Sequence, residues 1–340
     1  MLKHTTILKL LTAVAALSAT SASLRAQGSS GARAQEDKPK FDSVDAPDFK
    51  AKGWLLGRPA KDTPEEQLEL AANLEAAGKL RSATRAYDAL VSEWGASDIA
   101  KKAQLKVAEL YQKRGRPLDA FKEYQYFIEM FAGADEENFQ TAIASQFAIA
   151  NAESAKFDKG FWSSSDPVTT ADMYRKIISN APDWDKAPEC QFRRGACYEN
   201  SKKWVEAAFA YEALVTRYPD SSFKSDALYR AALSRVKMSD KFPRDERTMK
   251  NAILSLRLAY NNETGHASAA EAVEHHERLK KSLSKMNFEK AEFYDKIRNK
   301  PEAAIIAYKA FAKEFKDMPE TKKALDRIEI LQQNIPTVNR

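Results

Sequence analysis

The chain has 340 residues, enough for two ordinary domains or for one extended array of repeats. Hydrophobic residues make up 44% of it, and only 11 Gly and 13 Pro interrupt it, so the composition excludes global disorder and favours helices. The formal net charge is only +6. The most basic region, residues 275–330, mixes 14 Lys and Arg with 10 Asp and Glu, which indicates a solvated helical surface and not a nucleic-acid-binding stripe.

Residues 1–26 have the layout of a secretory signal peptide. Lys3 and Lys9 give a positive start, Leu10–Leu17 is a short apolar run, and small residues lead to Ala26. The run is shorter than the roughly 20 apolar residues that cross a bilayer. We expect cleavage near residue 23 or 27 and a mature protein in the periplasm, without a transmembrane segment. No cysteine stands near the cleavage site to accept a lipid, so association with the outer membrane is expected only through partners.

Residues 27–62 predict a flexible leader, because Gly28–Gly31 is followed by scattered Lys, Asp and Pro. An ordered array is expected over residues 63–335. Thr63 suits the position that caps a first helix, and Pro64 suits the first position inside it.

One pattern then recurs along the chain. A small residue is followed by an aromatic residue four positions later and by apolar residues seven, eight and eleven positions later, which places all five on one face of a helix. Clear copies start at Ala83, Ala120, Ala207 and Ala304, and weaker copies start at Thr170 and Ala252. The small residue lets a neighbouring helix approach closely, and the ring then packs against it.

Each copy has a further helix before it. Gly195, Tyr198, Ala207, Tyr211 and Pro219 have the spacing of the tetratricopeptide repeat (TPR), a helix–turn–helix unit of about 34 residues. The sequence therefore predicts an all-α fold, a right-handed TPR-type solenoid of about six units. Residues 268–297 lack Gly and Pro and predict one unusually long helix, and a final helix is expected over residues 320–333.

No motif in the sequence carries catalytic or cofactor chemistry. It has no Gly-rich phosphate loop, nucleophile elbow or zinc-binding helix motif, so we expect no enzyme activity, no cofactor and no metal. His275 and His276 are adjacent and point about 100° apart on a helix, which prevents them from sharing one ion. Cys190 and Cys197 are too far apart on one helix for a disulfide and are expected to be free core thiols.

Binding is expected on the concave face of the array, which the first helix of each unit lines. The TPR frame places two sets of residues there: Lys102, Leu105, Glu109 and Gln112 in the second unit, and Glu189, Phe192, Ala196 and Glu199 in the fourth. Such a mixed face suits an extended peptide or a partner helix.

The C-terminal part, roughly residues 137–335, resembles the BamD family, the TPR component of the bacterial outer-membrane barrel-assembly machinery. The resemblance rests on His276–Leu279, Lys290–Tyr294 and Ala303–Phe315. Ser239–Asp245 resembles the aspartate-rich insertion of the family, and Gly160–Pro167 aligns with that insertion as an alternative. Members of this family are lipoproteins, whereas this chain lacks the cysteine.

The resemblance implies recognition of unfolded outer-membrane proteins and docking on the barrel insertase. A docking surface is expected at Glu292, Phe293, Asp295 and Arg298, which combine polar groups with an apolar anchor. The alternative is a soluble periplasmic TPR adaptor for cell-envelope or division machinery, similar to CpoB. That family places a coiled coil before its repeats, for which residues 27–62 are too short and too broken.

Overall fold

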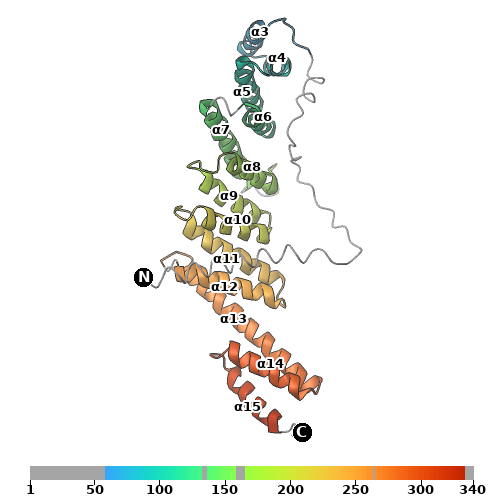
Figure 1. Ribbon diagram of the computed structural model, residues 1–340, viewed down its shortest axis with the longest axis vertical. Coiled ribbons are helices and arrows are strands. Elements are labelled where there is room, and N and C mark those ends of the chain that lie inside the picture. Colours follow the sequence, from blue (N-terminus) through green and yellow to red (C-terminus); the bar gives the residue numbers. More distant parts are fainter. Residues whose placement is uncertain (1–57, 132–135, 158–164, 263–264, 334–340) are drawn as a thin grey trace. The chain divides into compact units, whose positions relative to one another are not determined.

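The computed structural model of the protein describes residues 58–131, 136–157, 165–262 and 265–333. Within these ranges it consists of α-helices and one π turn, with no strand (Figure 1). The helices are α3 (Pro64–Ala76), α4 (Leu80–Glu93), α5 (Asp98–Lys113), α6 (Pro117–Phe131), α7 (Glu136–Ser154), α8 (Pro167–Asn180), α9 (Ala187–Asn200), α10 (Trp204–Arg217), α11 (Lys224–Lys241), α12 (Glu246–Asn262), α13 (Ala269–Glu292), α14 (Pro301–Glu314) and α15 (Glu320–Gln333), with the π turn η3 (Phe293–Ile297) after α13. The signal peptide and most of the leader lie outside the described residues.

Several helices begin where the sequence places a capping side chain. The Thr63 hydroxyl accepts a hydrogen bond from the Glu66 N–H at 3.3 Å, and Pro64 is the first residue of α3, as predicted. Ser97 caps α5 in the same way, and the Asp166 carboxylate accepts from two N–H groups at the start of α8. These caps satisfy N–H groups that have no partner inside the helix.

Each helix packs against the next helix in the chain, from α3 to α15. In addition α3 contacts α5 and α11 contacts α13, which is the order of contacts that stacked helix–turn–helix units produce. The pairs are α3/α4, α5/α6, α7/α8, α9/α10, α11/α12 and α13/α14, and α15 follows them. The prediction of an all-α TPR-type solenoid with about six units is confirmed.

The recurring small and aromatic residues form the crossing between the two helices of a unit. Ala83, Ala120, Ala207 and Ala304 are fully buried, and the tyrosines four positions later are at most 3% exposed. A buried glutamine in the first helix adds a polar contact in three units: the Nε2 groups of Gln67, Gln104 and Gln191 donate to the backbone carbonyls of Ala86, Glu123 and Ala210 at 2.9, 3.0 and 2.7 Å. These bonds fix the register of the two helices against each other, because a buried amide without a partner would be costly.

A residue with positive φ connects the two helices in four units, namely Gly78, Gly115, Lys202 and Asn299. In each case the buried tyrosine of the second helix stands nine positions later, so the turn fixes where the ring enters the core. Left-handed backbone is unstrained for Gly and tolerated by Asn, but it is unfavourable for Lys202.

The long C-terminal helix is present and ends in the π turn. α13 and η3 together span Ala269–Ile297, close to the predicted 268–297, and α15 has the predicted bounds. Of the Ser239–Asp245 segment, residues 239–241 end α11, and residues 242–245 form the short connection to α12, which begins at Glu246. Gly160–Pro167 lies mostly outside the described residues.

Candidate binding surfaces

The residues expected in the groove of the second unit are only partly available. Lys102 and Gln112 on α5 are exposed, and Glu109 is half-buried in an ion pair with Lys106 at 2.7 Å. Leu105 is only 8% exposed and belongs to the hydrophobic core, so its assignment to a binding surface is corrected: burial of its apolar side chain is the more favourable arrangement. Gln112 also accepts a hydrogen bond from the Tyr124 hydroxyl at 3.2 Å.

In the fourth unit the expected groove residues hold neighbouring helices together. The Phe192 ring lies 5.4 Å from that of Tyr211 and 5.2 Å from that of Phe223, and the Arg230 guanidinium lies 5.4 Å from its centre. Glu199 is bound by Arg230 at 2.6 Å. Glu189 is half-buried and pairs with Arg193 at 2.7 Å, and Ala196 is half-buried. All four residues are therefore only partly exposed, and a partner that binds α9 can contact only part of each side chain.

The C-terminal residues separate into a buried group and an exposed group. Asp295 is 6% exposed and accepts two hydrogen bonds from the Arg327 guanidinium, at 2.7 and 2.9 Å. Its assignment to a docking surface is therefore corrected, because this carboxylate joins η3 to α15. Phe293 is 41% exposed with the Arg298 guanidinium 5.6 Å from its ring, while half-buried Glu292 pairs with Lys296.

The Asp295 contact is one of three equivalent contacts that the sequence reasoning missed. In each, a carboxylate near the end of a first helix accepts from the tyrosine of the second helix and pairs with a cation from the first helix of the next unit. The three sets are Glu75, Tyr87 and Lys113; Glu199, Tyr211 and Arg230; and Asp295, Tyr308 and Arg327. The available signal was an acidic residue twelve or thirteen positions before each tyrosine.

In these contacts the pKa values of Glu75 and Asp295 are lowered, whereas those of the tyrosines are raised. The hydrogen bond from Lys113 lowers the pKa of Glu75, and the hydrogen bond from Arg327 lowers that of Asp295, in each case against the effect of burial. Burial and the neighbouring Glu75 raise the pKa of Tyr87 to about 12. Glu75 and Asp295 are therefore charged and the Tyr87 phenol is protonated at neutral pH, as the hydrogen bonds require.

The π turn explains the odd spacing in the last unit. Asp295 precedes its tyrosine by 13 positions, whereas Glu75 and Glu199 precede theirs by 12. The hydrogen bond that closes the turn joins Lys300 to Tyr294, one residue wider than the bond between Lys203 and Tyr198. The π turn accommodates one extra residue on the first helix and places Asp295 where it meets Tyr308 and Arg327.

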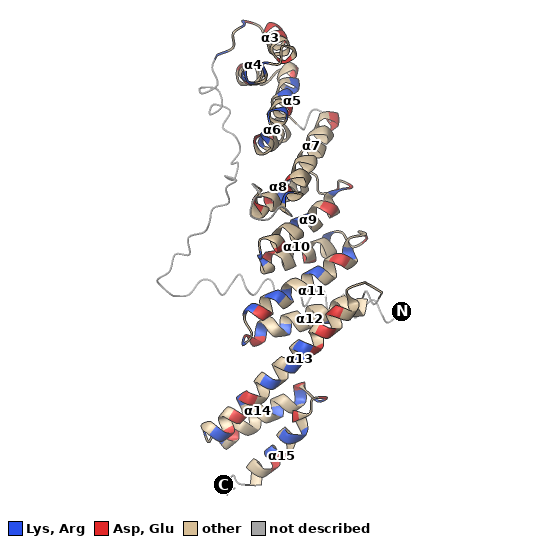
Figure 2. Cartoon of the chain, turned by 180° about the vertical axis from the view of Figure 1, so that it is seen from behind, with Lys and Arg blue, Asp and Glu red and all other residues tan. Residues whose placement is uncertain are grey.

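A hollow of about 330 Å³ lies between α12, α13 and α14. It is lined by the apolar side chains of Ile253, Leu254, Leu283 and Phe315, by the cations Lys250, Arg257 and Lys280, and by His276 and Glu314. An ion pair of 3.0 Å between Lys250 and Glu314 joins α12 to α14 at this hollow. Acidic residues lie at the start of α13, and four basic residues follow in its middle, namely Arg278, Lys280, Lys281 and Lys285 (Figure 2).

The described residues give little support for a nucleophilic cysteine, a metal site or a membrane-spanning helix. Cys190 and Cys197 are buried free thiols, as predicted, and burial raises the pKa of each to about 12, so neither is a ready nucleophile. The part of the chain that the structure describes contains no group of three His, Cys, Asp or Glu side chains able to hold a metal ion. None of its helices is long and apolar enough to span a membrane.

Three solved structures illustrate the likeness in fold. The crystal structure of the MamA protein matches with 15% identity and a TM-score of 0.30, over 61% of this chain and 94% of that one. The TPR domain of P58(IPK) matches with 17% identity and a TM-score of 0.31, over 78% and 77%. The C-terminal part of a TPR repeat-containing protein from Cytophaga hutchinsonii matches with 15% identity and a TM-score of 0.30, over 79% and 89%. At these TM-scores no argument about this chain rests on them.

Sequence comparison gives a more specific result. No curated protein matches this chain. Residues 194–337 match the sequence model of a family described as "YfiO: Outer membrane lipoprotein". The match begins within α9, later than the expected residue 137, and covers the units that carry the π turn and the 330 Å³ hollow. The expected resemblance to the BamD-like outer membrane lipoprotein family is thus confirmed for residues 194–337 of this TPR-type chain.

Proposed function

We propose that this protein is a periplasmic TPR scaffold that binds other proteins during the assembly of outer-membrane proteins. The observation that carries the proposal is the match of residues 194–337 to the outer membrane lipoprotein family. The composition of the first 26 residues supports export from the cytoplasm. In this role the chain has no catalytic step, and it acts by holding a barrel insertase or an unfolded outer-membrane protein.

The C-terminal units supply a surface with suitable chemistry. Phe293 and Ile297 stand one helical turn apart and are 41% and 69% exposed. Arg298 and Glu292 lie beside them, so apolar anchors are surrounded by polar side chains of both signs. Interfaces between soluble proteins combine a few buried apolar anchors with such a polar rim. We assign the docking surface to Glu292, Phe293, Ile297 and Arg298, and a weaker peptide contact to Lys102, Glu109 and Gln112.

Affinity purification from envelope extracts tests this assignment. A double variant with Phe293→Ala and Ile297→Ala is expected to lose at least about tenfold of the recovered barrel insertase, because truncated interface anchors cost more than 1 kcal/mol each. The matched control is Val205→Ala with Phe209→Ala, a similar pair one turn apart on α10 that is 41% and 58% exposed. The control is expected to keep wild-type recovery.

Two results would contradict the proposal. Equal loss in both double variants would show that the effect is not specific to the docking surface. Recovery of cell-wall or division proteins by the wild type, without a barrel insertase, would favour the envelope adaptor in its place. Mass spectrometry of the mature form tests the location separately, since an intact N-terminus would exclude export by cleavage.

A further inference from the structure

A second hollow, of about 570 Å³, lies in the N-terminal units, outside the region that matches the lipoprotein family. It is formed where the turn between α3 and α4 faces the turn between α5 and α6. The residues that line it are Gly78, Lys79, Leu80, Arg81, Ser82, Arg114 and Arg116. Four of these seven carry a positive charge and none carries a negative charge.

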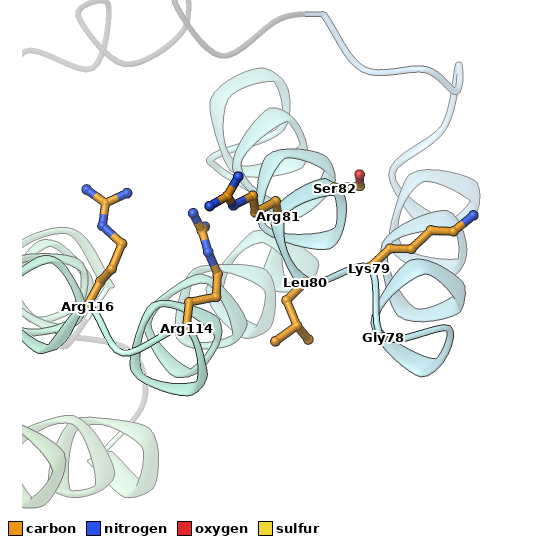
Figure 3. A pocket seen from close by; sticks show the side chains of 7 residues that line it. All are labelled: Gly78, Lys79, Leu80, Arg81, Ser82, Arg114 and Arg116. Carbon is orange, nitrogen blue, oxygen red and sulfur yellow. The ribbon is translucent and has the colours of Figure 1, made fainter.

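Three guanidinium groups project toward the same side of this hollow (Figure 3). They belong to Arg81, Arg114 and Arg116, whereas the Lys79 side chain extends away from them. Arg85 stands one helical turn after Arg81 on α4 and is also exposed, so it continues the basic surface beyond the rim of the hollow. The charges come from two successive units, and stacking of these units sets the distance between them.

Two of the arginines are held in place by the surrounding structure. Arg114 donates to the Thr84 hydroxyl at 3.1 Å, and Thr84 is itself 1% exposed and donates to the Leu80 carbonyl at 2.8 Å. Arg116 pairs with Asp119 at 2.7 Å. Both guanidinium groups lie over the Tyr111 ring, 5.1 and 5.2 Å from its centre. Fixed guanidinium groups lose little freedom when they bind an anion.

The other two arginines lack partners. Among the described residues neither Arg81 nor Arg85 forms a hydrogen bond or an ion pair through its side chain. Moreover, no side chain caps the N-terminus of α4, which begins at Leu80. The first residues of this helix line the hollow, so the partial positive charge of the helix N-terminus also lies there. The site therefore combines a concave surface, preorganised cations and unpaired cations.

We propose that this hollow binds an acidic segment of a partner protein, with two or more carboxylates spaced along an extended chain. Arginine recognises carboxylates through paired hydrogen bonds, which suits a row of Asp and Glu side chains. An extended peptide is narrow enough to contact the cations that line the hollow, whereas a flat bilayer surface would contact mainly its rim. The concave shape therefore favours a peptide over a membrane. The inference rests on the proposed function as a protein scaffold and adds a second contact point, separate from the docking surface.

The test uses the purified full-length chain and a fluorescein-labelled peptide of ten alternating Asp and Glu residues. Fluorescence anisotropy is expected to show saturable binding at moderate salt, weakened about tenfold or more in the double variant R81Q/R85Q. These side chains make no contacts that the fold needs, so the variant is expected to keep its helical circular dichroism spectrum. The matched control is R244Q/R247Q, which removes the same charge from two exposed positions, one in the turn after α11 and one in the first turn of α12.

The remaining arms distinguish the alternatives. Equal weakening in both double variants, or no saturable binding, would overturn the proposal. Displacement of the peptide by millimolar inorganic phosphate, or tighter binding to phosphatidylglycerol vesicles than to the peptide, would reassign the hollow to phosphate-bearing ligands. Recovery of the barrel insertase is expected to be unchanged in R81Q/R85Q, so failure here and failure of the proposed function are separate results.

Discussion

The first unit and the last unit are joined to the helix that follows them by the same kind of contact, made by different residues. In both, a carboxylate accepts a hydrogen bond from a buried tyrosine and pairs with a cation of the next unit. Glu75 lies on a regular helix before a glycine turn, whereas Asp295 lies in a π turn before Asn299. The comparison shows that this contact between units is retained even where the repeat spacing changes.

The two regions differ in what they leave exposed. Among the large apolar residues that are exposed, only Leu118 lies in α3–α6, whereas Phe293, Ile297, Ile306, Leu325 and Ile330 lie from η3 to α15. The N-terminal units instead present the cationic hollow around Arg81 and Arg114. The two ends of the array thus offer surfaces of different chemistry, which suits a scaffold that binds more than one partner segment.

The largest expected effect concerns the Asp295 contact. Asp295→Ala removes the carboxylate from a buried position and leaves both Tyr308 and Arg327 without their partner, so we expect it to lower the free energy of unfolding by about 3 kcal/mol. Glu75→Ala is expected to cost at most about 1 kcal/mol, because the Glu75 side chain is 21% exposed whereas that of Asp295 is only 3% exposed, so water reaches the groups that Glu75 leaves. Urea denaturation followed by circular dichroism measures both. Similar losses in the two variants would show that burial does not distinguish the contacts.

The pH dependence separates the charge of Asp295 from its shape. Its folded pKa lies below the ordinary value of 3.8, so the folded state gains stability from the ionised form above that pH. This contribution is lost as the pH falls below 3.8 and through the folded pKa. The difference in unfolding free energy between the wild type and Asp295→Asn is therefore expected to be constant near neutral pH and to shrink in acid. A difference that does not change with pH would indicate a packing effect.

The third prediction concerns the crossing of α9 and α10. A Cβ atom added at Gly195 would lie 2.5 Å from Cε1 of the fully buried Tyr211 ring. Gly195→Ala is therefore expected to destabilise the protein by about 2 kcal/mol, although alanine favours helix at an open position. Thermal denaturation measures it. Gly265→Ala serves as the control, because a Cβ atom there meets nothing within 4 Å.

Much of the fold could be predicted because one helical face repeats a simple pattern. The alanine and tyrosine spacing that starts at Ala83 and Ala207 specifies the second helix of a unit, and the crossing then follows from packing. The binding surface was less predictable. The repeat frame placed Leu105 on the concave face, and the family resemblance placed Asp295 on a docking surface. Both side chains are buried, because their environment depends on helices that are distant in sequence. The basic hollow was missed for the same reason, since Arg81 and Arg114 belong to different units and come together only when the units stack.

The smallest expected effect concerns the turns that connect the helices. Gly78 and Gly115 adopt left-handed backbone with φ of 71° and 68°, and Lys202 is held at φ of 57° at the equivalent position. A side chain on such a residue strains the backbone, so Lys202→Gly is expected to stabilise the protein by about 1 kcal/mol. The greater conformational entropy that glycine gives to the unfolded chain offsets part of this gain. The reverse change, Gly78→Ala, is expected to destabilise by a similar amount, because no neighbouring atom within 4 Å adds a clash to the strain. If urea denaturation showed Lys202→Gly to be destabilising, the lysine side chain would contribute to the turn between α9 and α10 beyond its backbone conformation.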